Sequence, residues 1–289
     1  MRLDDERESS NYEVRSGGRG GFGLPLGRGG LGCGSLIIIA IISLVLGVNP
    51  LTLIGGMEGS APVVQPGEPG GAPGELTETQ RRSLKVLGST ERVWGKLFAD
   101  QGGQYTPTIL AFYRGGTQSG CGNASSSAGP FYCPTDKRVF LDTSFFDDLG
   151  SRYGAPGEFA QAYVIAHEVG HHIQGLEGTL DRVRSAQSRL SEREANALQV
   201  KVELQADCYA GVWAANDKNL LEPGDAEAGM RAAAAVGDDT LQKQSQGTVV
   251  PEGFTHGSAA DRQKWLQIGL TSGDPARCDT FGGAMGGGR

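Results

Sequence analysis

The stretch from residue 158 to residue 175 constrains the chain most, because it contains the string H-E-x-x-H at positions 167–171. Apolar residues recur in it at steps of three and four, which predicts a helix. Residues four apart lie on one face of a helix, so His167 and His171 can offer two imidazole nitrogens to one metal ion. Glu168 is then placed to hold the attacking water, whereas His172 points away and is not expected to be a ligand. A motif this short also occurs by chance, so a third ligand is needed.

A second helical stretch supplies a candidate for that ligand. Ser191 and Glu194 predict a capping box at its start. Glu203 and Asp207 are four residues apart and share a helix face. Two histidines and one glutamate are a known ligand set for catalytic zinc, and Asp207 would accept a hydrogen bond from a ligand histidine, first of all His167. The alternative is that both acids are solvated charges on an amphipathic helix.

Together the two motifs resemble those of the gluzincins, the thermolysin-type branch of the zincins. Longer strings at residues 166–174, 203–213 and 255–259 closely resemble one family, the putative neutral zinc metallopeptidase family, which is bacterial and usually membrane-anchored. The likeness covers about residues 30–281. It implies an α+β, zincin-like (gluzincin) domain, mostly helical with a small β-sheet, preceded by one transmembrane helix. It also implies one Zn²⁺ per chain, bound by His167, His171 and Glu203, with Asp207 orienting a ligand histidine.

The metzincins are the alternative branch of zinc peptidases, and the sequence departs from their pattern. That pattern requires Gly at position 174 and His at position 177, where this chain has Gln174 and Glu177. Glu177 stays a minor candidate for the third ligand.

The first 75 residues differ in composition from the rest. Residues 1–30 are polar and Gly-rich, which predicts a disordered arm. Residues 31–54 are apolar and uncharged, which predicts one transmembrane helix, with a buried core helix or a cleaved signal peptide as alternatives. Residues 55–75 are rich in Gly and Pro and predict a flexible linker. The zinc peptidase domain is expected at residues 76–281, followed by a Gly-rich tail at residues 282–289.

Charge sets the expected orientation in the membrane. Arg15, Arg19 and Arg28 precede the apolar run and no arginine or lysine follows it closely, so the N-terminal arm is expected in the cytoplasm. The expected localisation is a bacterial cell membrane, crossed once, with the catalytic domain outside the cytoplasm. The net charge of −7 argues against a nucleic-acid partner, because it implies no basic surface.

Five cysteines are present, with Cys33 beside the apolar run and four in the domain. An even number of cysteines outside the cytoplasm predicts disulfides. The simplest pairing joins Cys121 to Cys133 and Cys208 to Cys278, although sequence alone allows three connectivities. Four reduced thiols are the alternative. Zinc binding by these cysteines is not expected, because no C-x-x-C pair is present.

Periodicity and turn residues predict the remaining elements. We expect further helices at residues 77–100, 179–189 and 225–246, and strands at residues 108–113, 131–133 and 138–142. Residues 115–129 are expected to form a Gly/Ser-rich loop. By the resemblance, residues 129–133 form the edge strand that lies above the metal and pairs with extended substrate. An ordinary hairpin is the alternative for this region.

His256 is the one histidine of four that lies outside residues 167–172. A lone histidine is more often a surface or capping residue than a catalytic one. The resemblance favours a role in donating a hydrogen bond to the oxyanion of the tetrahedral intermediate. Arg262 is expected to brace this segment, and Tyr163 and Tyr209 are other candidate donors.

The expected function is that of a membrane-anchored zinc metalloendopeptidase in which Glu168 is the general base for hydrolysis of peptide bonds. The expected partners are a peptide or unfolded protein substrate and the membrane. The alternative from another class is a membrane-tethered binding or regulatory domain with a structural or vestigial zinc site, although such a domain has no need of Glu168. A third alternative is hydrolysis of cell-wall peptides or another amide. The sequence leaves the substrate, self-processing and the oligomeric state open.

Overall fold

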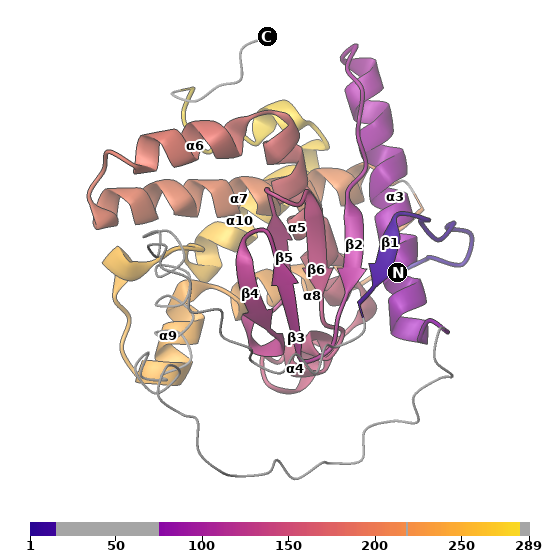
Figure 1. Cartoon of the computed structure of the whole chain (residues 1–289), viewed down its shortest axis with the longest axis horizontal. Helices are drawn as coiled ribbons and strands as arrows, with labels where there is room; N and C mark the ends of the chain where they lie inside the picture. The colour runs from indigo at the N-terminus through magenta and orange to yellow at the C-terminus, as the bar shows by residue number, and fades with distance from the viewer. Residues whose placement is uncertain (16–74, 218, 284–289) are drawn as a thin grey trace, which may run out of the picture.

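The computed structural model describes residues 1–15, 75–217 and 219–283 (Figure 1). The transmembrane helix predicted at residues 31–54 lies outside the described residues, as does almost all of the linker predicted at residues 55–75. Within the described ranges, no helix combines the length and the apolar character that a membrane crossing requires.

The main sheet is small, as the α+β prediction requires. Its strand order is β1-β2-β6-β5, with β1 at Tyr12–Val14, β2 at Ile109–Phe112, β5 at Phe131–Cys133 and β6 at Arg138–Leu141. Strands β1 and β6 both pair with β2 in parallel, whereas β5 is antiparallel to β6. Strands β1 and β5 are therefore the two edges of this sheet.

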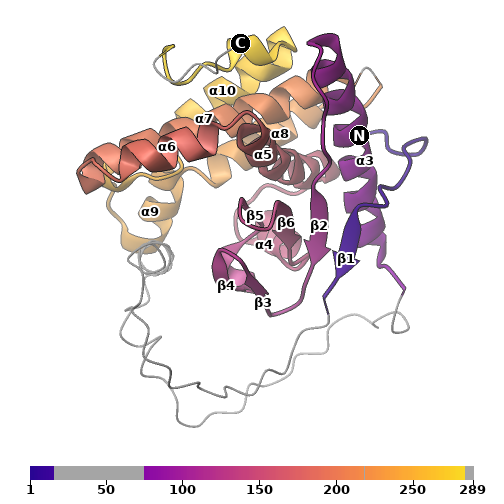
Figure 2. The same cartoon turned by 45° about the horizontal axis from the view of Figure 1, so that its top comes forward.

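Helices cover one face of the sheet. α5 (Glu158–Leu176) lies between the sheet and α7 (Glu192–Asn216), and α3 (Glu78–Asp100) contacts both helices (Figures 1 and 2). α6 (Thr179–Gln187) and α10 (Ala259–Ser272) lie against α7. With the sheet on one side and α7 on the other, α5 is almost wholly buried.

Local signals set where the long helices begin. Thr77 caps α3 and exchanges hydrogen bonds with Gln80, and Ser191 caps α7 and does the same with Glu194. The capping box predicted for α7 is therefore confirmed. The helices predicted at residues 77–100 and within residues 158–175 agree closely with α3 and α5.

The two inner strands, β2 and β6, are apolar on both faces, as buried parallel strands usually are. Leu110 and Phe112 of β2 belong to the large core. Ala111 points to the opposite face, where it packs with Cys133 and Phe140. This alternation follows from the two-residue period of a strand.

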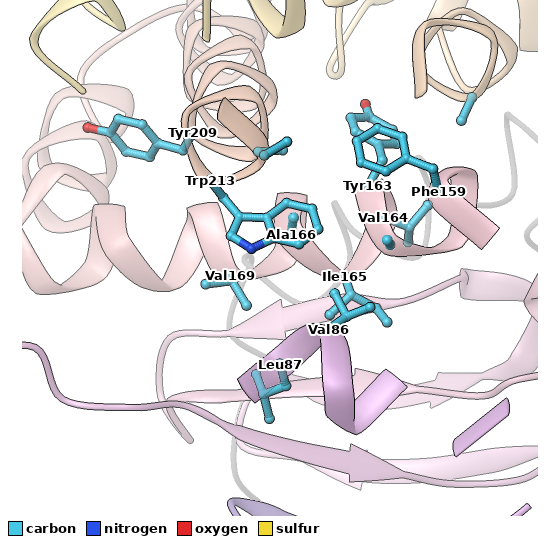
Figure 3. Packing of buried hydrophobic residues seen from close by; sticks show 14 of the residues in the cluster. Val86, Leu87, Phe159, Tyr163, Val164, Ile165, Ala166, Val169, Tyr209 and Trp213 are labelled. Atoms are coloured by element: carbon cyan, nitrogen blue, oxygen red, sulfur yellow. The ribbon is translucent and has the colours of Figure 1, made fainter. Parts of the chain in front are cut away.

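The large core lies where α3, α5 and α7 meet, and Figure 3 shows the buried side chains that gather there. Phe159 of α5 stacks on Trp213 of α7 with ring centroids 6.2 Å apart. The indole N–H of Trp213 donates to the hydroxyl of Ser89 on α3 over 2.8 Å. Trp213 therefore fixes all three helices relative to one another.

The single helix predicted at residues 225–246 is wrong. The structure has two helices there, α8 (Asp225–Ala235) and α9 (Asp238–Gln246). Gly237 separates them in an extended conformation, and a Cβ on it would lie 2.5 Å from the backbone nitrogen of Ala259. The chain bends at this glycine because another segment passes too close for a side chain.

The sequence patterns do not predict α10, which crosses α7 in close contact. A Cβ on Gly211 would lie 2.3 Å from the carbonyl oxygen of Leu266, and one on Gly269 would lie 2.0 Å from that of Cys208. Glycine at both positions therefore lets the two helix backbones touch.

The Gly/Ser-rich loop predicted at residues 115–129 also contains regular structure. Strands β3 (Gly116–Ser119) and β4 (Gly122–Ser125) pair there as a short antiparallel hairpin. Its residues are small and polar, so the alternation of apolar residues that marks a half-buried strand is missing.

The disordered arm predicted at residues 1–30 is wrong for the part that the structure describes. Residues 1–15 pack against the domain, with Leu3 buried in the large core and β1 paired with β2. Polar side chains of this segment find partners on α3, which its composition alone does not reveal.

Both predicted disulfides are present. Cys121 is bonded to Cys133, which ties the β3–β4 turn to the edge strand β5. Cys208 is bonded to Cys278, which ties α7 to the segment after α10. Cys33 lies outside the described residues.

Asp142 fastens the end of β6 to the segments around it. Its carboxylate accepts hydrogen bonds from the backbone N–H groups of Gly115 (2.8 Å) and Ser144 (3.1 Å) and from the hydroxyls of Ser126 and Ser144. Burial raises the pKa of Asp142, but these hydrogen bonds outweigh burial and hold the pKa below its usual value. The ionised carboxylate therefore stabilises the fold.

We predict that Asp142→Asn lowers the free energy of unfolding by about 1–3 kcal/mol at pH 7, because an amide cannot accept all of these hydrogen bonds. The pKa is lowered by folding, so this contribution is complete above the unfolded value of about 3.9 and is lost as the pH falls through the folded value. Denaturant unfolding at neutral and acid pH should show the difference shrinking. Asp147→Asn, at an exposed position of α4 (Phe145–Ser151), should cost less than about 0.5 kcal/mol. Equal losses in both variants would contradict the role of Asp142.

Candidate metal centre

The site forms where α5 crosses α7 at close range. A Cβ on Gly170 would lie 3.0 Å from both the Cα and the carbonyl oxygen of Ala206. These two small residues let the helix backbones approach, so that the histidines of α5 face the acids of α7. His167, His171 and Glu203 are thereby brought to one point.

The three side chains have the spacing of metal ligands. Glu203 Oε2 lies 3.2 Å from His167 Nε2 and 3.4 Å from His171 Nε2. In a tetrahedral site with metal–ligand distances of about 2.0–2.1 Å, neighbouring ligand atoms are about 3.3–3.4 Å apart. The two distances to Glu203 therefore have the values expected around one metal ion, and all three ligand atoms of this trio lie within 4.8 Å of one another.

Asp207 lies behind His167, one helical turn along α7 from Glu203, and is fully buried. His167 donates from Nδ1 to Asp207 Oδ1 over 2.8 Å, and the hydroxyl of Tyr163 donates to the same oxygen over 2.6 Å. Arg262 of α10 donates to both carboxylate oxygens over 2.9 Å. These contacts hold the His167 ring with Nε2 turned toward Glu203.

Arg262 reaches Asp207 because α10 lies directly on α7 at the glycine pair described above. Its side chain is buried, and a third hydrogen bond runs from Nη1 to the carbonyl oxygen of Val236 over 3.1 Å. The sequence predicts Arg262 as a brace for the segment around His256. In the structure its guanidinium bonds mainly Asp207 instead, so Arg262 helps to hold the candidate ligand His167 in place.

The charges around the trio favour a bound cation. Burial lowers the pKa of His167, but Asp207 and Glu203 outweigh burial and raise it to about 10. Burial raises the pKa of Asp207, but Arg262 and His167 hold it at about 2. The pKa of Glu203 is held well below its usual value against burial, foremost by His171. Both carboxylates are therefore ionised at neutral pH. Their negative charge favours the binding of a proton or a metal ion by the two histidines.

Gln174 supports the second histidine, a role that the sequence analysis missed. His171 donates from Nδ1 to Gln174 Oε1 over 2.8 Å. The Gln174 amide in turn donates to the carbonyl oxygen of Val202 over 2.7 Å and to Gln205 Oε1 over 3.0 Å. The spacing of three residues on one helix could have indicated the first contact. Each histidine thus has a partner on Nδ1, which leaves Nε2 for a metal.

Glu168 is buried beside the trio and faces the edge strand β5. Its carboxylate accepts a hydrogen bond from the backbone N–H of Tyr132. Burial raises the pKa of Glu168, and the charges of His171 and His167 only partly oppose this. A carboxylate with a raised pKa next to a metal position is suited to accept and return a proton near neutral pH.

The strand β5 is held over α5 by a side-chain contact as well. His172 Nε2 donates to the carbonyl oxygen of Thr106 over 2.6 Å, so Nδ1 accepts from the hydroxyl of Tyr132, 3.2 Å away. β5 forms an antiparallel pair with β6 and is also the sheet edge beside the metal helix. β5 is therefore both one strand of a hairpin and an edge of the sheet beside α5, whereas its pairing with substrate stays a prediction.

His256 lies close enough to the trio to sense the charge of Glu203, in the segment between α9 and α10. Its Nδ1 is 3.2 Å from Asp238 Oδ1 and its side chain is 42 % exposed. Asp238 Oδ2 accepts from the backbone N–H groups of Thr255, His256 and Gly257 over 2.6–2.9 Å. Burial lowers the pKa of His256, but Asp238 first and then the charge of Glu203 raise it. Asp238 was not predicted from the sequence. The preceding glycine, Gly237, is the one local signal that the backbone is constrained at this point.

Glu177 lies apart from the trio, and the hydroxyls of Tyr163 and Tyr209 are both bonded to carboxylates. Glu177 is at the end of α5 and accepts a hydrogen bond from the hydroxyl of Tyr209 over 2.8 Å. Glu177 is therefore not brought to the trio as a third ligand. The hydroxyl of Tyr163 is directed at Asp207, so both tyrosine hydroxyls are already engaged.

Comparisons with known proteins agree with the character of this site. The family described as putative neutral zinc metallopeptidase matches residues 1–281. The protein YpfJ of Escherichia coli K12 is 45% identical over 98% of this chain and 99% of its own length. The protein Rv2575 of Mycobacterium tuberculosis is 44% identical over 71% of each chain. No solved structure matches.

Both relatives are described as uncharacterized proteins, so they establish kinship and not an activity. The family match begins at residue 1 and therefore includes the N-terminal segment that packs on the domain. Because the match spans nearly the whole chain, the chain belongs to the neutral zinc metallopeptidase family.

Proposed function

We propose that the protein is a zinc-dependent metallopeptidase that hydrolyses peptide bonds. The single observation that carries this proposal is the meeting of His167, His171 and Glu203 at ligand spacing with Glu168 buried beside them. Two imidazoles and one carboxylate suit zinc, and three protein ligands leave the open position of a catalytic site.

One zinc ion held by the trio would act as a Lewis acid toward a water molecule and a substrate carbonyl. Glu168 takes a proton from the attacking water as its oxygen bonds to the carbonyl carbon. When the carbon–nitrogen bond breaks, Glu168 delivers that proton to the leaving amine. The hydrogen bond from Tyr132 keeps the Glu168 carboxylate directed toward β5.

His256 is our candidate for stabilising the negative charge that develops on the substrate oxygen. Asp238 orients the ring through Nδ1, so Nε2 is the nitrogen that can donate to substrate. The three backbone hydrogen bonds to Asp238 fix the segment that carries His256. A donor held in place before the reaction stabilises the transition state without costly reorganisation.

The substrate that fits this site best is an extended peptide or a segment of unfolded protein. In the described part of the chain, no strand pairs with the outer edge of β5. An extended peptide could add to that edge and place a scissile bond beside Glu168. Peptides of the cell wall are a second candidate class of substrate.

We place the catalytic domain outside the cytoplasm, since its two disulfides suit an oxidising compartment. Attachment to a bacterial cell membrane stays part of this proposal, but a single crossing through residues 31–54 does not, because residues 1–15 pack on the domain itself.

We predict that Glu168→Gln binds one zinc per chain, as the wild type does, and loses hydrolysis of an unfolded protein by at least about 10²-fold. Zinc is measured by elemental analysis of the purified full chain and hydrolysis by the appearance of new peptide termini. Glu203→Gln should lose zinc, whereas Glu177→Gln should keep both zinc and activity, because Glu177 bonds Tyr209 away from the trio.

Zinc binding without hydrolysis of a broad set of peptides and cell-wall fragments by the wild type would favour a tethered binding domain instead. Loss of zinc from Glu177→Gln and not from Glu203→Gln would overturn the ligand assignment.

We predict that Asp207→Asn weakens zinc binding by about 10–100-fold, because the amide no longer carries the charge that holds His167 and strengthens it as a ligand. Competition with a chelator measures the affinity, and circular dichroism checks that the helices are retained. Asp261→Asn, at an exposed position on α10, is the control and should bind zinc normally. Normal affinity in Asp207→Asn would show that this carboxylate serves only the packing of α7 and α10.

We predict that His256→Ala lowers kcat by about 10²–10³-fold with zinc content and KM little changed. His256→Gln should recover part of kcat, because a glutamine amide can still donate a hydrogen bond to the oxyanion. Steady-state kinetics on a fluorogenic peptide measures both variants. An unchanged kcat in His256→Ala would remove this residue from the catalytic machinery.

A further inference from the structure

The outer edge of β2 and the neighbouring flank of α3 form a docking surface, and the N-terminal segment of the chain, residues 1–15, occupies it (Figures 1 and 2). We propose that this docking is a fixed part of the native domain, so that residues 1–15 and the metal centre lie on the same side of the membrane. This placement excludes a single membrane crossing between residues 15 and 75. The sequence analysis expects such a crossing, with these residues in the cytoplasm.

Strand pairing is the first observation behind this proposal. In the parallel pair of β1 and β2, Tyr12 is opposite Leu110 and Val14 is opposite Phe112. The backbone N–H of Leu110 donates to the carbonyl oxygen of Asn11 over 2.9 Å, and that of Arg15 donates to Phe112 over 2.8 Å. Without β1, the edge of β2 would present unpaired backbone N–H and C=O groups. β1 pairs with this edge and satisfies them.

The second observation is a close contact with α3 that admits only glycine. A Cβ on Gly88 would lie 2.3 Å from the carbonyl oxygen of Arg7. Beside this contact, Glu91 Oε1 accepts hydrogen bonds from the hydroxyl of Ser9 over 2.6 Å and from the amide of Asn11 over 2.8 Å. The backbone N–H of Ser9 donates to the carbonyl oxygen of Leu84 over 2.9 Å. The segment and the helix are therefore complementary in shape and in polar groups.

The third observation is that the segment also contacts the end of α7. Arg92 of α3 bonds both Glu6 of the segment and the buried Asp217 that ends α7, the latter over 2.8 Å. The backbone N–H of Arg2 donates to the carbonyl oxygen of Leu220 over 2.8 Å. Leu3 is 7% exposed within the core that α3, α5 and α7 share. These contacts require the folded domain, so they cannot form across a bilayer from it.

Membrane topology follows from these contacts by simple geometry. One crossing between residues 15 and 75 would put the segment and the domain on opposite faces of the bilayer. A second copy of the chain could not supply the missing segment, because it would be inserted in the same orientation. Residues 15 and 75 must therefore lie on the same side of the membrane, which a single crossing between them does not allow.

Cysteine labelling of the full chain in spheroplasts tests this arrangement. Both variants are made in a Cys33→Ser background. Val14→Cys shows on which side of the membrane residues 1–15 lie, and Lys96→Cys shows the same for the domain. The two positions are 58% and 73% exposed. We expect a membrane-impermeant maleimide to label both before lysis and to equal extents. Labelling of Lys96→Cys before lysis but of Val14→Cys only after lysis would overturn the proposal. Labelling of both only after lysis would support a shared side and would instead refute the extracytoplasmic placement proposed above.

A pair of glycine variants on α3 tests the docking itself. Gly88→Ala places a methyl group against Arg7, whereas a Cβ on Gly95, two turns along the same helix, meets nothing within 4 Å. We expect Gly88→Ala to lower Tm by roughly 2–8 °C and to speed tryptic cleavage after Arg7 by roughly tenfold or more. Gly95→Ala should leave the cleavage rate unchanged and should keep or slightly raise Tm, because alanine favours a helix over glycine. Zinc content shows whether each domain is folded. Unchanged cleavage after Arg7 in Gly88→Ala would overturn the docking.

Discussion

The close crossing of α5 and α7 at Gly170 and Ala206 is the constraint on which the metal centre depends. A side chain at residue 170 would push the helices apart and move Glu203 away from both histidines. The second close crossing, of α7 with α10 at Gly211 and Gly269, depends on the same kind of contact. Packing of backbone against backbone thus sets the distances between polar groups that lie on three different helices.

A fully buried carboxylate at Asp207 is costly unless its charge is compensated. Arg262 supplies the opposite charge in a two-point contact, and Tyr163 and His167 supply further donors. Such a buried network seldom adds stability over well-packed apolar side chains, whereas the loss of one member leaves an unpaired charge. Its effect here is geometric, because it fixes the direction of the His167 ring.

The parts of the site that the sequence predicts are those encoded within one helical turn. H-E-x-x-H and E-x-x-x-D each place two groups on one helix face, and the capping box of Ser191 and Glu194 is equally local. The cysteine pairing was predicted only as the simplest of three connectivities, and the structure has that pairing. Arg262 is different, because its contact with Asp207 depends on the close crossing of α7 and α10 at two glycines. The apolar pattern of the sequence does not predict α10. Likewise, nothing local marks residues 1–15 as a partner for Gly88.

The two edges of the main sheet differ, and the difference bears on function. Unpaired strand edges invite association, and folded proteins usually cover them. On one side the sheet ends at β1, a strand of only three residues that pairs with β2 and whose segment makes polar contacts with α3. The other edge, β5, is held in place by a disulfide at Cys133 and by the contact of Tyr132 with His172. That edge lies next to Glu168, and no described strand covers it. Under the proposed function, this edge beside a buried carboxylate and the His–His–Glu trio is where a peptide backbone would find both hydrogen-bond partners and the groups proposed to cleave it.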